Sequence, residues 1–124
     1  MERFQVGSST ELIPITYPRQ NCYKVGNKVH IEFVASTQQD MASNVAWAMI
    51  PKKYAPNTKY GSNTGYTGIC VIETSTMYLP AICGAYASPI DENVHTGYGG
   101  AVYQSVSSSI PSGMRVQIMM EYYI

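Results

Sequence analysis

Charged side chains are scarce in this sequence, and the few that it has are balanced in sign. Only 13% of the 124 residues are Asp, Glu, Lys or Arg, with eight acids and eight bases, so the formal net charge is zero. Domains that bind nucleic acids or anionic membranes usually carry clustered Lys and Arg. The one local basic run, Lys52-Lys53, is too short for such a cluster. The charge pattern therefore argues against nucleic acid and membrane surfaces as partners.

Long apolar runs are lacking as well. No stretch approaches the roughly 18 uninterrupted apolar residues that a membrane helix requires. Residues 1–6 contain no apolar segment of the kind found in signal peptides. We therefore expect neither membrane insertion nor a signal peptide.

Cysteine is rare, and its count is odd. Cys22, Cys70 and Cys83 form no close Cys-x-x-Cys pair, so neither a disulfide framework nor a zinc knuckle is indicated. Each lies among apolar residues, which favours free thiols that serve as small core side chains. An alternative, that Cys70 and Cys83 meet across adjacent strands, stays open.

The residues that most enzymes need are also few. A catalytic site of this size usually combines a base, a nucleophile or acid, and a group that stabilises charge, but the chain has only two histidines. His30 alternates with apolar positions, which is typical of a histidine on the surface of a strand. No serine lies in a Gly-x-Ser-x-Gly elbow. We expect no enzyme, no catalytic residues and no cofactor.

Two polar segments resemble ligand loops only in part. Residues 97–100 are glycine-rich, but no Lys-Ser/Thr follows them as in a phosphate loop, so we expect a bend or the close approach of another backbone. Asp91, Asn93 and His95 lie in a polar cluster whose spacing matches no defined calcium loop. We expect no metal there, and a solvated loop that touches a ligand.

Alternation of apolar and polar residues predicts strands. It is clearest over residues 114–124 and recurs over 28–36, after a strand at 22–25 and the turn pair Gly26-Asn27. A two-residue turn would place Tyr23 beside His30 on the more polar face. A loop one residue longer would reverse that face, so the register stays open.

Further short strands are expected along the chain, at residues 11–16, 45–50, 66–73, 77–83 and 101–106. Residues 73–76 join two apolar runs as a hairpin, and the best helix candidate, 37–44, is expected to be a loop. Gly7-Ser8-Ser9, Pro14 and Pro18 interrupt the beginning of the chain. This predicts an all-β, antiparallel sandwich or barrel over 21–124, with 1–20 as an arm or edge element.

Tyrosine is the abundant side chain, with eleven copies. Its ring offers a flat apolar surface and a hydroxyl at low entropic cost, a mixture that suits neutral sugars. Tyr60, Asn63 and Tyr98 lie among loop-forming residues and are the candidates for ligand contact, with the 91–95 cluster beside them. The alternative is that many of these rings fill the core or a subunit interface.

Two short segments carry a resemblance to a known family. Val25-Gly26-Asn27-Lys28-Val29-His30-Ile31 has a "G-x-x-V-x-I" hairpin, and Ile50-Pro51-Lys52-Lys53-Tyr54-Ala55-Pro56 follows it. With the long C-terminal β region, these segments resemble the head domains of bacteriophage tail fibres and baseplate receptor-binding proteins. Ile50 stands where the family has leucine, and a later "G-x-V-x-I" strand is blurred at residues 66–71.

The resemblance implies a homotrimer of β-sandwich or jelly-roll heads, located in the virion and made in the host cytoplasm. Such heads bind a bacterial cell-surface glycan or protein receptor without a cofactor. Trimerisation would also cover apolar surface on a chain with few charges, and Met119 and Tyr123, on the outer side of the last strand, are the interface candidates. The alternatives are a structural tail or baseplate module that contacts other virion proteins, and a monomeric cellular carbohydrate-binding module.

Overall fold

The computed structural model describes residues 1–7, 15–37, 40, 47–56, 66–73, 78–87, 98–104 and 113–124. Within these ranges the chain forms strands and one short 3-10 helix, η1. They are β1 (Glu2–Phe4), β2 (Ile15–Gln20), β3 (Cys22–Val25), β4 (Lys28–Thr37), β5 (Ala48–Pro51), η1 (Lys52–Tyr54), β6 (Tyr66–Glu73), β7 (Tyr78–Ala87), β8 (Tyr98–Gln104) and β9 (Arg115–Tyr123). The prediction of an all-β, antiparallel protein is confirmed.

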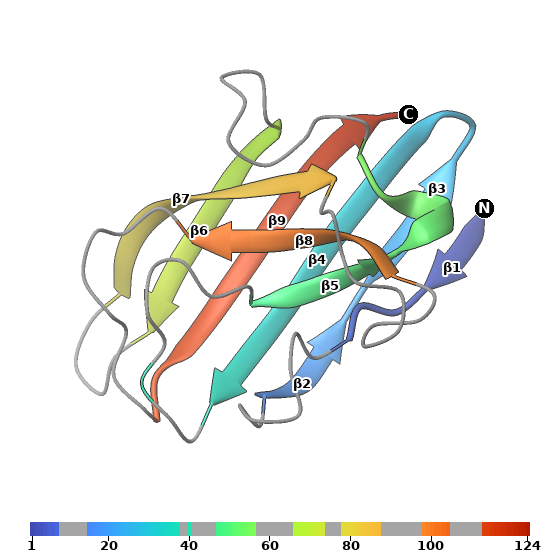
Figure 1. Cartoon of the computed structure of the whole chain (residues 1–124). Helices are drawn as coiled ribbons and strands as arrows, with labels where there is room; N and C mark the ends of the chain where they lie inside the picture. The colour runs from blue at the N-terminus through green and yellow to red at the C-terminus, as the bar shows by residue number, and fades with distance from the viewer. Residues whose placement is uncertain are drawn as a thin grey trace.

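All of these strands belong to one sheet. Its order is β1-β3-β4-β9-β6-β7-β8-β5, and β2 also pairs with β4. The central pair is β4 and β9, joined over nine residue pairs from Lys28↔Tyr123 to Ser36↔Arg115. Figure 1 shows that the sheet curls over itself, so that β8 and β5 lie across β4 and β9. One face of the central pair is therefore covered by the sheet's own far end.

The covered face carries the core. Because side chains alternate along a strand, every second residue of β4 and β9 points to the same side. These residues are at most 3% exposed: Val29, Ile31, Phe33, Ala35, Val116, Ile118, Met120 and Tyr122. They form one cluster with Trp47, Ala48 and Ile50 from β5 and the residue before it, and with Val102 of β8. We call this side the inner face and the opposite side the outer face.

The two ends of the sheet meet beside β5. Gly7, just after β1, forms an antiparallel bridge with Met49, with N···O distances of 3.0 and 2.8 Å. The Tyr17 hydroxyl lies 2.8 Å from the carbonyl oxygens of Gly7 and Trp47, and it can donate its single proton to either. These bonds connect strands that are at opposite ends of the sheet order.

The segment around η1 strengthens this closure. The ring of Tyr54 stacks on Phe4 of β1, with centroids 4.0 Å apart and planes 9° apart. Lys53 pairs with Glu2, and the Tyr122 hydroxyl donates a hydrogen bond to the carbonyl oxygen of Tyr54. Residues 50–56 thus have a structural role, because they connect β5 to β1 and β9.

A two-residue turn joins β3 to β4. Val25 is paired with Lys28, and Gly26 has φ of +59° whereas Asn27 is not in a positive-φ conformation. Positive φ at the first central residue alone is the type II′ pattern, which matches the twist of the flanking strands. The turn places Tyr23 opposite His30, which decides the register that the sequence left open.

Several predicted strands have the expected place. The bounds of β3 and β6 agree with the prediction; β4 differs from it by one residue at its end, and β9 by one residue at each end. Strand β7 pairs with β6 from Glu73↔Tyr78 onward, as the predicted hairpin requires, but it continues beyond Cys83 to Ala87. The segment 37–44 lies outside the described residues except for its first residue, Thr37 of β4, and Asp40.

The beginning of the chain contributes strands to the same sheet. Strand β1 pairs with β3, and β2 pairs with β4 through an irregularity between Thr16 and Arg19, where Pro18 lies. Proline lacks the N–H of a ladder bond and is tolerated at such bulges. The described parts of residues 1–20 therefore continue the sheet of residues 21–124.

The glycine-rich tract is a strand and not a loop. Residues 98–100 begin β8, and Tyr98 is paired with Pro51. A Cβ atom on Gly99 would lie 2.9 Å from the Cα of Lys52. The expected close approach of another backbone is confirmed, since Gly99 lies against Lys52 at the start of η1. The placement of Tyr98 in a loop is wrong, because Tyr98 begins β8.

Candidate functional site

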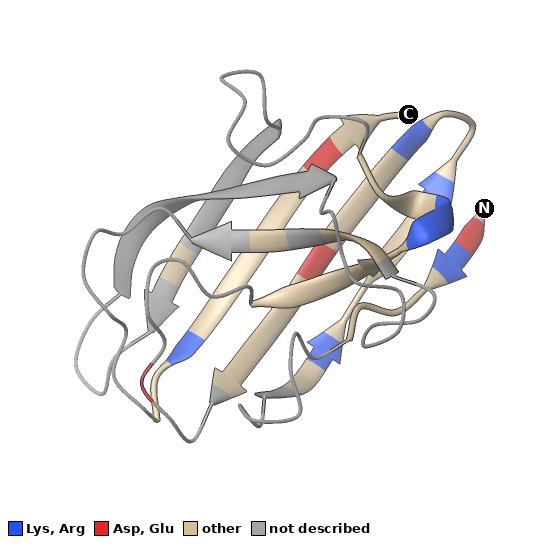
Figure 2. Cartoon of the chain, in the orientation of Figure 1, with Lys and Arg blue, Asp and Glu red and all other residues tan. Residues whose placement is uncertain are grey.

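The outer face of β4 and β9 is the part of the sheet that the curl leaves uncovered. Its residues form cross-strand rows, because directly paired residues share a face. From one end to the other, the rows are Lys28–Tyr123, His30–Glu121, Glu32–Met119, Val34–Gln117 and Ser36–Arg115. Figure 2 shows charged residues along β4 and β9, whereas β5 carries none.

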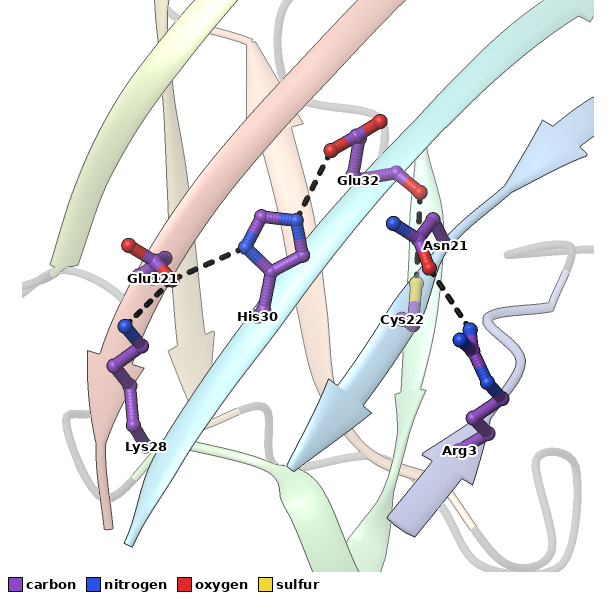
Figure 3. Close-up of polar contacts among 7 residues, drawn as sticks. All are labelled: Arg3, Asn21, Cys22, Lys28, His30, Glu32 and Glu121. Carbon is purple, nitrogen blue, oxygen red and sulfur yellow. Dashed lines mark hydrogen bonds and ion pairs between the residues drawn. The ribbon is translucent and has the colours of Figure 1, made fainter. Parts of the chain in front are cut away.

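His30 is the centre of an ionic cluster near one end of this face. Its Nδ1 lies 3.2 Å from an oxygen of Glu121, and its Nε2 lies 3.0 Å from an oxygen of Glu32. Figure 3 shows the ring held between the two carboxylates. Each ring nitrogen can donate a hydrogen bond to its carboxylate when it carries a proton. Lys28 Nζ completes the cluster, 3.1 Å from the same Glu121 oxygen.

These contacts shift the ionisation of the exposed members of the cluster. Hydrogen bonds from Lys28 and then from His30 lower the pKa of the Glu121 carboxyl below its ordinary value of 4.5. The same carboxylate raises the pKa of Lys28 above 10.5. Each partner thus favours the charged form of the other, which is the expected effect of an opposite charge at close range.

His30 is buried, although it lies on the outer face. The ring of Tyr23 stacks on it with centroids 4.6 Å apart and planes 17° apart, and only 8% of His30 is exposed. The expectation of an ordinary surface histidine is wrong for this reason. Its nearest ionic partner, Glu32, stands two residues along the same strand, and the alternation of a strand places such residues on one face.

Strand β3 is tied to β4 beside this cluster. The backbone N–H of Asn21 donates to the carbonyl oxygen of Glu32 at 2.8 Å, and Cys22 Sγ lies 3.7 Å from the same oxygen. Asn21 also accepts a hydrogen bond from Arg3 at 2.9 Å, as Figure 3 shows. Burial raises the pKa of the Cys22 thiol above 9.0, so the thiol is neutral. Cys22 is a free, buried core residue, as predicted.

The other two cysteines are not directly paired. The register of β6 and β7 places Cys70 opposite Ala81, and Cys83 opposite Gly68. They therefore lie two positions out of register with each other. The alternative in which Cys70 and Cys83 face each other across adjacent strands does not agree with this register.

Large apolar side chains are exposed on the same face. Met119 is 44% and Tyr123 is 65% exposed, so their predicted outward orientation on β9 is confirmed. Val25, beside the turn, is 51% exposed. Exposed apolar side chains gathered on one sheet face are typical of interaction surfaces.

A shallow depression of about 230 Å³ lies beside Met119. Its outer-face lining combines apolar side chains with an acid, a base and an amide: Arg19, Glu32, Val34, Val71, Gln117 and Met119. Phe33 and Ile118, whose side chains point to the inner face, also border it. It therefore spans β2, β4, β9 and β6 at the middle of the outer face. An apolar floor with a few polar groups around it is the usual composition of a ligand site.

The remaining sequence-predicted ligand residues are not brought together by the described structure. Tyr60, Asn63, Asp91, Asn93 and His95 lie outside the described residues. Tyr98 is at the start of β8, and its backbone alone is described. Ligand contact by these residues stays a prediction.

Two further findings concern metals and membranes. Across the described ranges, no group of three or more His, Cys, Asp or Glu side chains is arranged to hold a metal ion. Among the same residues, no helix has the length and apolar character needed to span a membrane.

The sequence reasoning missed the outer-face groups that the register assembles. Glu32 could have been found from its spacing to His30 on one strand. Glu121, Arg19 and Arg115 could not, because they come from strands that are distant in the sequence. Comparison of the chain with protein-family models, with curated proteins and with solved structures gave no match.

Proposed function

We propose that this chain is the head domain of a bacteriophage or phage-derived tail protein, which binds a receptor on the host envelope as a homotrimer. In this proposal the curled sheet is a β-sandwich or jelly-roll-like head, and the outer face of β9 lies between subunits. The receptor is a cell-envelope saccharide, bound by the tyrosine-rich loops. Adhesion requires no cofactor and no reaction.

One observation carries the proposal: the central pair of the sheet has an ordered outer face from which large apolar side chains project. Met119 and Tyr123 lie on β9, whose backbone is paired with β4 from Arg115 to Tyr123 and, from Arg115 to Met119, with β6 as well. A monomer would leave these side chains in water. Burial between copies of the chain removes them from water and is worth roughly 25 cal/mol per Å² of apolar area.

The fold adds support from a second direction. Both segments that carry the family resemblance have structural roles. Gly26 forms the tight turn between β3 and β4, and the ring of Tyr54 stacks on Phe4 of β1. Residues used in this way constrain a fold and not a reaction. The resemblance therefore concerns the architecture of a head domain, and the receptor must be found by experiment.

Sedimentation equilibrium tests the trimer directly. The 13.7 kDa chain is expected to sediment with three times its mass, and the variant pair Met119→Glu with Tyr123→Glu is expected to sediment as a monomer. Gln5→Glu, which adds a charge of the same sign at an exposed position of the N-terminal segment, serves as the control and should remain trimeric. A wild-type monomer would overturn the trimeric head and favour a carbohydrate-binding module.

Adhesion to host cells tests the receptor-binding role. Tyr60→Ala and Tyr98→Ala are expected to weaken binding of the intact trimer to bacterial cells, because each removes a ring that can stack on a sugar. Unchanged adhesion would contradict glycan binding by these residues. A trimer that binds no cells, but binds other tail proteins, would identify the chain as a structural tail or baseplate module.

A further inference from the structure

A second depression lies at the end of the outer face that is remote from Tyr123. It has a volume of about 270 Å³ and is lined by Pro18, Arg19, Val34, Arg115 and Gln117. It adjoins the first depression, with which it shares Arg19, Val34 and Gln117. Two arginines therefore border a recess whose floor is a valine and an amide side chain.

The register explains why these two arginines flank one recess. Arg19 of β2 is paired with Val34 of β4, and Val34 is paired with Gln117 of β9. Arg115 stands in the next row, opposite Ser36. The arginines thus approach Val34 from the strands on its two sides, although they are 96 positions apart by number in the sequence.

Neither guanidinium is neutralised within the part of the chain that the structure describes. Lys28 pairs with Glu121, Lys53 pairs with Glu2, and Arg3 donates to Asn21. Within the same ranges, neither the Arg19 guanidinium nor the Arg115 guanidinium makes a hydrogen bond or an ion pair. Each guanidinium has five N–H donors, so both recess-bordering residues retain their full capacity to bind an anion.

We propose that this recess is a subsite for an oxyanion carried on a small polyhydroxylated unit. A planar guanidinium binds carboxylate or phosphate oxygens in pairs, and such charge-assisted hydrogen bonds are stronger than neutral ones. The Gln117 amide can contact hydroxyl groups, while Val34 and Pro18 offer apolar surface to C–H groups. The recess is below the roughly 300–1,000 Å³ of drug-sized sites, so it fits one sugar or polyol unit.

The assignment of this unit to an envelope polymer rests on the proposed function, whereas the subsite itself does not. Acidic sugars carry the oxyanion as a carboxylate, and polyol-phosphate polymers carry it as a phosphate diester or monoester. The subsite lies at the Arg115 end of β9, while the proposed trimer contact uses the Met119–Tyr123 end. Both can therefore exist in one assembly.

Titration of the ¹⁵N-labelled 124-residue chain with four probes tests the subsite. The probes are D-glucuronate and glycerol 3-phosphate, with glucose and glycerol as their neutral counterparts. The expected result is that at least one anion shifts the backbone amide signals of Val34, Arg115 and Gln117, while its neutral counterpart does not. Whichever anion binds identifies the carboxylate or the phosphate as the recognised group.

Matched variants assign the effect to the arginines. Arg19→Gln and Arg115→Gln are each expected to weaken binding by up to about fivefold, the size of an exposed ion pair. Arg3→Gln removes an exposed arginine elsewhere in the sheet and should leave binding unchanged.

Three results would overturn the subsite: no shift with either anion, equal shifts with the neutral probes, or binding that survives loss of both arginines. Adhesion assays separate this outcome from failure of the proposed function. If the anions fail but Tyr60→Ala still weakens adhesion, only the subsite is wrong. If an anion binds but the trimer does not adhere to cells, the host-binding role is wrong and the subsite stands.

Discussion

The two faces of β4 and β9 share one backbone, yet they differ in almost every physical property. The inner face is a continuous apolar surface of β-branched, aromatic and methionine side chains, nearly all completely buried. The outer face carries, in five rows, an ionic cluster, two exposed apolar residues and Arg115, which borders the recess together with Arg19 of β2. One face is filled by the protein itself, and the other carries exposed side chains.

Whether a residue of these strands packs in the core or lies on the outer face depends on its place in the alternation along the strand. Neighbouring residues along a strand point to opposite faces, so Ile118 packs in the core while Met119, next to it, is exposed. A one-residue change of register would exchange the two sets. The turn that fixes the register is therefore as important for the outer face as the outer-face residues themselves.

The largest effect is expected for substitutions that compare these two neighbours on β9. Ile118→Ala should lower the free energy of unfolding by about 2–5 kcal/mol, because it leaves a cavity in the closed core. Met119→Ala should change it by no more than about 0.5 kcal/mol, as for other surface positions. Urea denaturation, at a protein concentration below that of self-association, measures both. Equal losses would contradict the division into a packed and an open face.

The second effect concerns the turn that sets the faces. Gly26→Ala should destabilise the protein by about 1–2 kcal/mol, since an alanine at positive φ is strained. No atom lies within 4 Å of the added Cβ, so the cost is conformational and not steric. Asn27→Ala, at the other central position without positive φ, is the control and should cost less in the same denaturation experiment. If both variants cost the same, the type II′ assignment is wrong.

The sequence predicted the central strands well because their local pattern and their tertiary role agree. Alternation alone located β4 and β9, and it identified Met119 and Tyr123 as outward-facing. The Gly26-Asn27 pair located the hairpin. In these strands each residue's position relative to the core repeats every two residues, so a short window is enough to detect it.

The strands that the sequence did not predict correctly, such as β1 and β8, are positioned by residues that are distant in the sequence. Strand β1 has three residues and no pattern of its own, and it is held by Tyr54, fifty positions away. Strand β8 begins in glycines because Gly99 lies against the backbone of Lys52, and glycine in a sequence signals a turn as readily as a close contact. The ionic cluster and the arginine recess depend on how β2, β4 and β9 are paired. A short stretch of sequence does not contain this information.

A third, smaller effect is expected at the end of the outer face where the His30 cluster lies. Tyr23→Ala removes the ring stacked on His30 and should cost about 0.5–1.5 kcal/mol, the range for aromatic pairs. A double-mutant cycle with His30→Ala isolates the interaction of the two rings. The matched cycle uses Val25→Ala, which is paired with Lys28 and not with His30, and its coupling should be close to zero. A Tyr23–His30 coupling of zero would show that this row does not stabilise the sheet.

The smallest effect is a pH dependence that arises from the same end of the face. Because the pKa of Glu121 is lowered in the folded protein, its stabilising effect is present above 4.5 and is lost as the pH falls below that value. The pKa of Lys28 is raised, so its stabilising effect is present below 10.5 and is lost as the pH rises further.

The difference in unfolding free energy between the wild type and Glu121→Gln should therefore form a plateau between these limits. It should decrease on both sides, with Lys28→Gln reproducing the alkaline limb. The ion pair between Glu2 and Lys53 is common to all three proteins and cancels in the difference. Since salt screens exposed ion pairs, the plateau should also be lower in concentrated salt. A difference that persisted at low pH would mean that Glu121 stabilises the outer face by packing and not by charge.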